Sequence, residues 1–270
     1  MTFLDLFLNF FTHKDFLPPA SEIPGTLFTP LHFIFSGLCL AGVIIFAIYL
    51  SKTDEKNMKR ILTAIWVVIV VLEIIKTLWE TYGGKSVNFF VQGCLPLYPC
   101  SIFLFTYPIA LWGKGLVKHS VSVYVCTLGL LGASINFFYP ANILSSYSCI
   151  SFAGCLTLLN HGTMLLAALV LILRGDIKFT GVNNGIEILC GAIPVLLFSI
   201  PVNIVNFTLN ADYMFFKCDS FILKFIGDAT PDFVTVILMY LFYILLHTAP
   251  FLPSYISGIL RKRGENKKTA

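Results

Sequence analysis

Long apolar segments, joined by short polar connections, dominate the chain. Seven of them approach or exceed the roughly 20 apolar residues that a helix needs to cross the hydrocarbon core of a bilayer. They lie at residues 31–50, 61–82, 95–112, 120–138, 150–173, 185–209 and 231–252. The pattern predicts an all-α membrane protein whose seven transmembrane helices form a single domain at residues 31–252.

The two ends of the chain differ from this domain. Residues 1–16 carry several phenylalanines on one face, and Asp5 stands where a signal peptide would be basic. They predict a short helix that lies on the membrane surface, with His13 exposed to solvent. Prolines interrupt the rest of the N-terminal region, which extends to residue 30, and residues 253–270 form a basic tail.

The composition excludes an ordinary soluble domain. Charged residues make up 12% of the chain, against about 25% in a typical soluble domain. Thirteen of the 18 lysines and arginines fall on one side of the predicted bundle. Because cytoplasmic connections are enriched in basic residues, the N-terminus is expected outside and the C-terminus in the cytoplasm. Anionic inner-leaflet lipids are the expected partners of the basic loops and tail, and nothing indicates nucleic-acid binding.

The eight cysteines form no recognisable metal or disulfide framework. They include no CxxC pair, and the chain has no HExxH motif, so neither a metal site nor a cofactor is expected. Cys94, Cys149 and Cys218 fall near predicted loops on one side of the bundle, which leaves open a bridge between two of them.

Cys100 stands in an unusual position, because the sequence Leu-Pro-Leu-Tyr-Pro-Cys-Ser opens the third apolar segment at residues 95–101. Proline is favoured at the first position of a helix, so Pro99 predicts a helix start at which Cys100 lies among unpaired amide groups. The partial positive charge there favours a thiolate and can hold an anion. The alternative is that Cys100 serves only as a small apolar packing residue.

Three ionisable residues interrupt the second apolar segment. Glu73, Lys76 and Glu80 are spaced by three and four residues, so they share one face of the helix. An ionisable group in the middle of a membrane helix costs on the order of 2.5 to 3.5 kcal/mol, so this face is expected to point into the bundle or into a wet cavity. A self-paired triad that only stabilises the bundle is the alternative.

Further polar residues fall in the outer or central parts of the predicted helices. They are His32, Tyr98, Asn136, Asn160, His161, Asn203 and Asn206. Together with the three ionisable residues they predict a polar binding site in the outer half of the bundle, where Cys100 also lies. Some have simpler explanations: Asn203 and Asn206 could bond backbone groups freed by Pro201, and Tyr98 could be an interfacial aromatic.

Three short motifs together resemble a known family. They are the Leu-Pro-Leu-x-x-Cys-Ser run that ends at Ser101, the Asn-His-Gly step at 160–162, and the Glu-x-x-Lys of Glu73 and Lys76. They are similar to the bacterial YwaF-type integral membrane proteins, which are distantly similar to eukaryotic transmembrane protein 164. The resemblance covers most of the chain, from about His32 onward, and it implies a multi-pass protein of the bacterial plasma membrane.

For the eukaryotic relative, the resemblance implies transfer of fatty acyl groups between phospholipids through a cysteine thioester, with a histidine assisting. Carried over to this chain, Cys100 matches the cysteine and His161 matches the histidine. A phospholipid or lysophospholipid is then the expected substrate. The family often has a histidine where this chain has Tyr98, which leaves the contribution of that position open.

Two other functions are compatible with the sequence. Glu73, Lys76, Glu80 and His161 could form the path of an ion- or proton-coupled transporter, although no internal repeat of the kind common in transporters is visible. A receptor or structural protein with a buried polar cluster is the third possibility. Loss of activity on substitution of Cys100 would favour the enzyme, and loss on substitution of Glu73 alone would favour the transporter.

Overall fold

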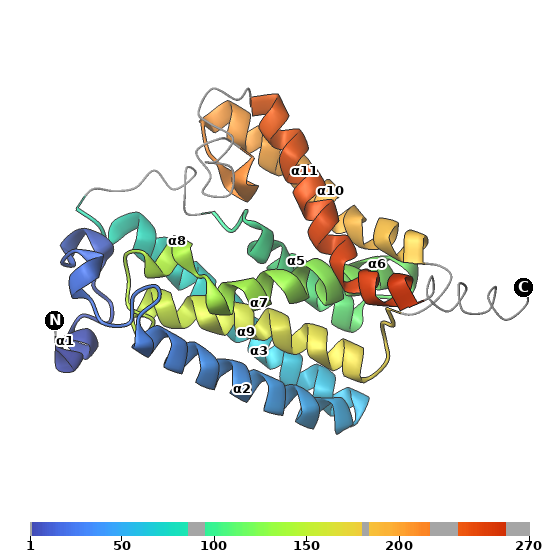
Figure 1. Ribbon diagram of the computed structural model, residues 1–270, viewed down its shortest axis with the longest axis horizontal. Helices are drawn as coiled ribbons and strands as arrows, with labels where there is room; N and C mark the ends of the chain where they lie inside the picture. The colour runs from blue at the N-terminus through green and yellow to red at the C-terminus, as the bar shows by residue number, and fades with distance from the viewer. Residues whose placement is uncertain (1, 86–94, 180–183, 217–231, 258–270) are drawn as a thin grey trace, which may run out of the picture.

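The computed structural model describes residues 2–85, 95–179, 184–216 and 232–257, and every regular element among them is helical (Figure 1). The α-helices are α1 (Phe3–Leu8), α2 (Pro30–Lys52), α3 (Glu55–Tyr82), α5 (Pro99–Trp112), α6 (Gly115–Tyr124), α7 (Leu130–Phe138), α8 (Ala141–Leu144), α9 (Phe152–Leu173), α10 (Asn184–Leu209) and α11 (Asp232–Thr248). A π-helical turn, η3 (Val125–Gly129), joins α6 to α7. Short 3-10 turns are η1 (Lys14–Phe16), η2 (Ala20–Glu22), η4 (Tyr213–Phe215) and η6 (Ala249–Phe251).

Six helical stretches of the described chain are long and apolar enough to cross a membrane. They are Pro30–Lys52, Glu55–Tyr82, Gly115–Leu144, Phe152–Leu173, Gly185–Leu209 and Phe233–Ser257. The remaining predicted segment, at residues 95–112, becomes helical only at Pro99, and its 14-residue helix is about 21 Å long. The all-helical membrane fold is confirmed, and a seventh complete crossing stays a prediction, as does the orientation of the termini.

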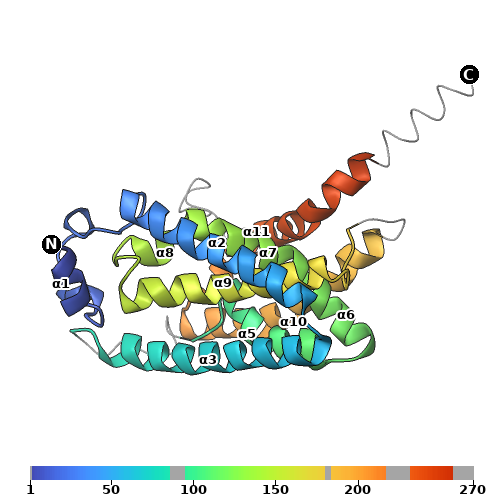
Figure 2. The ribbon, with the colours of Figure 1, turned by 90° about the horizontal axis from the view of Figure 1, so that it is seen from below.

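Helix α9 forms the centre of the bundle. It contacts α2, α3 and α7, and Figure 2 shows it between α2 and α3. Small residues along α9 let these neighbours approach closely, which is how helices associate in membranes. Gly162, for example, lies against Val43 of α2 and Phe137 of α7. The most buried helix of the fold therefore carries His161.

Helices α10 and α11 run side by side, obliquely to the other long helices (Figure 1). Helix α10 packs on α6, and α11 packs on the π-helical turn η3. Within that contact Thr127 of η3 and His247 of α11 form a buried side-chain hydrogen bond. A π turn widens the helix locally, and here it brings a threonine hydroxyl to a neighbouring helix.

The basic connections gather at the end of the bundle opposite α1. Arg174, after α9, donates hydrogen bonds to the carbonyl oxygens of Ser51 (3.4 Å) and Thr53 (2.9 Å) in the α2–α3 connection. Asp54 then caps α3 by accepting the amide of Asn57 at 3.0 Å, and this bond lowers the pKa of the Asp54 carboxyl. The clustering agrees with the predicted sidedness of the loops.

The N-terminal region is less helical than the sequence predicts. The helix expected over residues 1–16 ends at Leu8, because Asn9 caps α1 and turns the chain. The following residues fold back onto the bundle, and the amide of Phe152 donates to the carbonyl of Phe10 at 2.9 Å. The N-terminal region is therefore anchored to the start of α9.

Substitution of Gly154 by alanine should destabilise this arrangement. A Cβ at Gly154 would overlap the carbonyl oxygen of Ser148 and crowd the backbone of Cys149, which is itself fixed by a 2.8 Å bond to Gly25. We expect a loss of about 1–3 kcal/mol in unfolding free energy, measured as a lower melting temperature in detergent. Gly132→Ala is the matched control, since no neighbouring atom lies within 4 Å of its Cβ. Equal melting temperatures for the two variants would contradict the packing argument.

Candidate functional site

The candidate site begins at the start of α5. As the sequence predicts, Pro99 is the first residue of the helix, and Tyr98 precedes it as the cap. The carbonyl oxygen of Tyr98 accepts the amides of Ser101 (2.8 Å) and Ile102 (3.3 Å). Cys100, the second residue of α5, is partly exposed, and its amide has no acceptor among the described residues. A free amide thus accompanies a partly exposed cysteine.

Two indole hydrogen bonds fix how α3 and α5 lie against each other. Trp66 of α3 donates to the carbonyl of Leu104 at 2.8 Å, and Trp112 of α5 donates to the hydroxyl of Thr63 at 2.9 Å. The pairing is antiparallel, since a later residue of α3 meets an earlier residue of α5. Continued toward the start of α5, the same register brings Cys100 to the level of the ionisable residues of α3.

The ionisable residues of α3 divide into two groups. Glu73 is buried, and its carboxylate accepts a hydrogen bond from the Lys76 ammonium at 2.8 Å. Glu80 instead lies 3.3 Å from the ring of His13, so the self-paired triad considered from the sequence is wrong. Helix α3, which carries the Glu73–Lys76 pair, contacts both α5 with Cys100 and α9 with His161.

His161 is buried in α9 with a defined ring orientation. Its Nδ1 lies 2.7 Å from the carbonyl oxygen of Thr157, one helical turn earlier. Because a carbonyl can only accept, Nδ1 carries the proton and Nε2 keeps its lone pair. No other hydrogen bond engages the ring within the described part of the chain. This tautomer can take up a proton at Nε2, which is what a general base requires.

Several other predicted residues carry buried polar atoms without forming part of this group. His32 accepts the amide of Phe28 at Nδ1, and its Nε2 has no partner among the described residues. The side-chain oxygens of Asn136, Asn160 and Asn203 are likewise buried without a partner there. No hydrogen bond between described residues joins them to Cys100 or His161, so their role as ligands to the substrate stays a prediction.

Two tyrosines that the sequence did not single out hold the start of α5. The hydroxyl of Tyr124 donates to the carbonyl of Pro99 at 3.0 Å. The hydroxyl of Tyr213 accepts the amide of Leu95 at 3.0 Å, and its ring meets that of Tyr98 edge to face at 5.2 Å. Both contacts join segments far apart in sequence, so no local pattern signals them.

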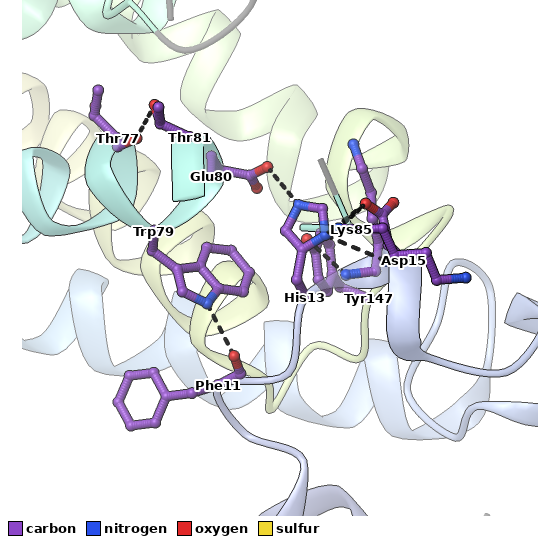
Figure 3. A network of polar contacts seen from close by, with 10 residues as sticks. Phe11, His13, Asp15, Thr77, Trp79, Glu80, Thr81, Lys85 and Tyr147 are labelled. Atoms are coloured by element: carbon purple, nitrogen blue, oxygen red, sulfur yellow. Dashed lines mark hydrogen bonds and ion pairs between the residues drawn. The ribbon is translucent and has the colours of Figure 1, made fainter. Parts of the chain in front are cut away.

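His13 forms the hub of a second polar network, at the α1 end of α3 (Figure 3). Only 2% of its surface is exposed, so the prediction that it is solvated is wrong. Its Nε2 faces Glu80, and its Nδ1 accepts the amide of Asp15 at 3.3 Å. Trp79 of α3 packs on the imidazole and donates to the carbonyl of Phe11 at 2.9 Å. We call residues 9–16 with these contacts the N-terminal strap.

The connection between α8 and α9 also holds the strap in place. The hydroxyl of Tyr147 accepts the amide of Lys14 at 3.2 Å, and its ring packs on Trp79. Burial, and to a lesser degree the nearby Glu80 carboxylate, raises the pKa of Tyr147, so the hydroxyl stays protonated. The strap thereby ties the end of α3 to α9 at the level just beyond Lys76.

Substitution of His13 by leucine should loosen the strap, because Glu80 and Asp15 would lose the ring nitrogens that they face. We expect trypsin cleavage after Lys14 to accelerate roughly tenfold, since a largely buried polar group left without its partner is costly. The cleavage rate is measured on protein in detergent, together with the melting temperature. His119→Leu is the control, because the His119–Glu187 pair has the same chemistry but more exposed side chains and should contribute little to stability. Unchanged cleavage in the His13 variant would refute the anchoring role.

Neither a metal cluster nor a disulfide appears within the described residues. No group of three or more histidines, cysteines or acidic residues there could hold a metal ion. The cysteines at 39, 100, 126, 149, 155 and 190 are free thiols. Cys94 and Cys218, two of the three candidates for a bridge, lie outside the described residues.

The long apolar helices and the buried ionisable residues define a helical, multi-pass membrane protein. The chain belongs to the TMEM164 family, whose family model matches residues 27–257. This confirms the distant similarity to transmembrane protein 164, and the closer YwaF-type assignment stays a prediction. The match includes Glu73, Lys76, Cys100 and His161 but begins after the N-terminal strap. Searches among curated proteins and among solved structures returned no match.

Proposed function

We propose that this protein is a membrane enzyme that transfers a fatty acyl group between phospholipids through a thioester on Cys100. The observation that carries the proposal is the convergence of three helices. Cys100 is partly exposed at the start of α5, Lys76 forms an ion pair on α3, and His161 is buried on α9 with a defined tautomer. These three helices contact one another pairwise. The resemblance to transmembrane protein 164 supports the same chemistry.

In the first step, His161 Nε2 takes the thiol proton, and the Cys100 sulfur attacks the carbonyl carbon of a phospholipid ester. The tetrahedral intermediate collapses to a thioester, and the lysophospholipid oxygen leaves with the proton from His161. In the second step the hydroxyl of another lysophospholipid attacks the thioester and gives its proton to His161. The departing sulfur regains that proton, so the enzyme returns to its starting state.

Two groups would stabilise the negative oxygen of the intermediate. The free amide of Cys100 lies at the positive end of α5, and the Lys76 ammonium on the adjoining helix α3 would add a positive charge. Glu73 accepts a hydrogen bond from Lys76 at 2.8 Å, which restricts the position of the long lysine side chain. In an environment with little water these interactions are stronger than at an exposed surface.

The substrate would arrive from the membrane, since the outward faces of α3 and α5 are lined by apolar side chains, among them Ile74, Leu78 and Phe105. We place the α1 end outside the cell and the basic end in the cytoplasm, where anionic lipids would contact its lysines. A transporter is the weaker reading. Glu73 is paired with Lys76 and Glu80 with His13, so these groups do not form a continuous titrating path.

Substitution of Cys100 by serine should abolish transfer. Purified wild-type protein in vesicles containing phosphatidylcholine with a labelled acyl chain, together with unlabelled lysophospholipid, should acquire a label on Cys100 that hydroxylamine releases. Because serine lacks the nucleophilic thiolate, the variant should carry no adduct and transfer no label. Cys190→Ser, which alters another partly exposed thiol, is the control and should behave as wild type. Undiminished transfer by the Cys100 variant would refute the mechanism.

Substitution of His161 by glutamine should slow transfer at least about 100-fold, because the general base is lost while a polar side chain of similar length remains. The lipid-transfer rate is measured at saturating lysophospholipid, so the change appears in kcat. The control is His119→Gln, which removes a histidine at the opposite end of the bundle. Equal rates for the two variants would show that His161 has only a structural role.

A further inference from the structure

The chain turns back into the bundle directly after α10. Ala211, Tyr213, Met214 and Phe216 are each at most 2% exposed, although they belong to a connection. Asn210 and Met214 adopt positive φ angles of 52° and 57°. Non-glycine residues keep this costly conformation only where their surroundings fix it, and such residues cluster at functional sites. We call residues 211–216 the buried turn.

Side chains of α10 and α11 hold the buried turn from two directions. The Asn206 side-chain amide donates to the carbonyl of Tyr213 at 2.8 Å, and its oxygen accepts the Tyr213 amide at 2.8 Å. Asn206 thus bonds both the amide and the carbonyl of Tyr213, as the backbone of a neighbouring β-strand would. From α11, the hydroxyl of Tyr243 donates to the carbonyl of Met214 at 2.7 Å. These contacts leave Tyr213 little freedom to move.

Tyr213 in turn holds the segment that leads into α5. Residues 95–98 are not helical, so their backbone amides need partners from elsewhere in the fold. The Tyr213 hydroxyl accepts the amide of Leu95, and its ring packs on Tyr98, whose carbonyl accepts the first amides of the helix. An unbroken series of contacts therefore runs from Asn206 through Tyr213 to the helix start that carries Cys100.

We propose that Tyr213 and Asn206 are positioning residues for Cys100, and that the buried turn sets where the thiol lies and how easily it is reached. The consequence for acyl transfer rests on the proposed function. The effect on the thiol itself does not, because it follows from the contacts alone. Two tyrosines fix this helix start together, since Tyr124 holds the carbonyl of Pro99 while Tyr213 holds the backbone three residues before Tyr98.

The test measures the reactivity of Cys100 in full-length protein reconstituted in phosphatidylcholine vesicles. N-ethylmaleimide is the probe, and alkylation of each cysteine is followed by mass spectrometry of its peptide. Tyr213→Phe keeps the ring but leaves the Leu95 amide without its acceptor, so we expect Cys100 to be alkylated roughly tenfold faster. Asn206→Leu should have an effect at least as large, because it frees the whole turn.

Two internal comparisons separate positioning from general unfolding. Cys126 is fully buried in the core, so its alkylation reports loss of the fold and should stay slow in both variants. Tyr107→Phe is the matched control, since it removes another buried hydroxyl, in α5 itself, that has no partner among the described residues. It should leave the reactivity of Cys100 unchanged.

The outcomes distinguish this inference from the proposed function. Faster alkylation of Cys100 alone, with a lower kcat and an unchanged KM for acyl transfer, supports the positioning role. Cys100 alkylation within about twofold of wild type in both variants overturns it, as does an equal rise at Cys126. If the variants expose Cys100 as expected but wild-type protein transfers no acyl group, the positioning role stands and the proposed function fails.

Discussion

Backbone groups that leave a helix inside a membrane bundle must find partners within the protein, and much of this structure follows from that requirement. Two segments break the helical pattern near the candidate site, at residues 95–98 and 211–216. Side chains rather than regular backbone pairing bond both segments: Tyr213 of the second segment bonds the first, and side chains of α10 and α11 bond the second. The hydroxyls of Tyr124, Tyr213 and Tyr243, together with the amide of Asn206, supply these bonds. These side-chain bonds allow the helical pattern to break within the bundle. The break before Pro99 sets the start of α5 among the other helices.

Buried charged side chains also need partners within the protein, and this explains how the ionisable residues of α3 are paired. Glu73 finds Lys76 on its own helix, at a spacing that any helix would bring together. Glu80 pairs with His13, which lies 67 residues earlier in the chain. Trp79 and Tyr147 in turn hold the strap that carries His13. The consequence is a helix whose end is fixed to the N-terminal region and to α9. Lys76, one turn before that end, is thereby held at a defined place between α5 and α9.

The sequence predicts those parts of the site that depend on local rules. The apolar segments locate six long helices, and several ends agree within a residue or two, for example Tyr82 and Phe138. Pro99 marks the start of α5 because its fixed φ and missing amide suit a first helical turn. The pairing of Glu73 with Lys76 follows from their spacing. In contrast, the burial of His13 and the roles of Tyr124 and Tyr213 depend on tertiary contacts across 25 to 118 residues, which leave no periodic signal.

The shortness of α5 connects these observations. This 14-residue helix starts where the side chains of Tyr124 and Tyr213 bond the adjoining backbone, so its positive end lies among side chains of the bundle. Had residues 95–98 continued the helix, the amide of Cys100 would bond a carbonyl one turn earlier and could not meet an anion. Two prolines, at positions 96 and 99, disfavour that continuation, and Tyr213 stabilises the extended alternative by accepting the Leu95 amide. The reactive character assigned to Cys100 is thus a property of where the helix begins. That position is determined by the two nearby prolines, Pro96 and Pro99, together with Tyr213, which lies more than a hundred residues away.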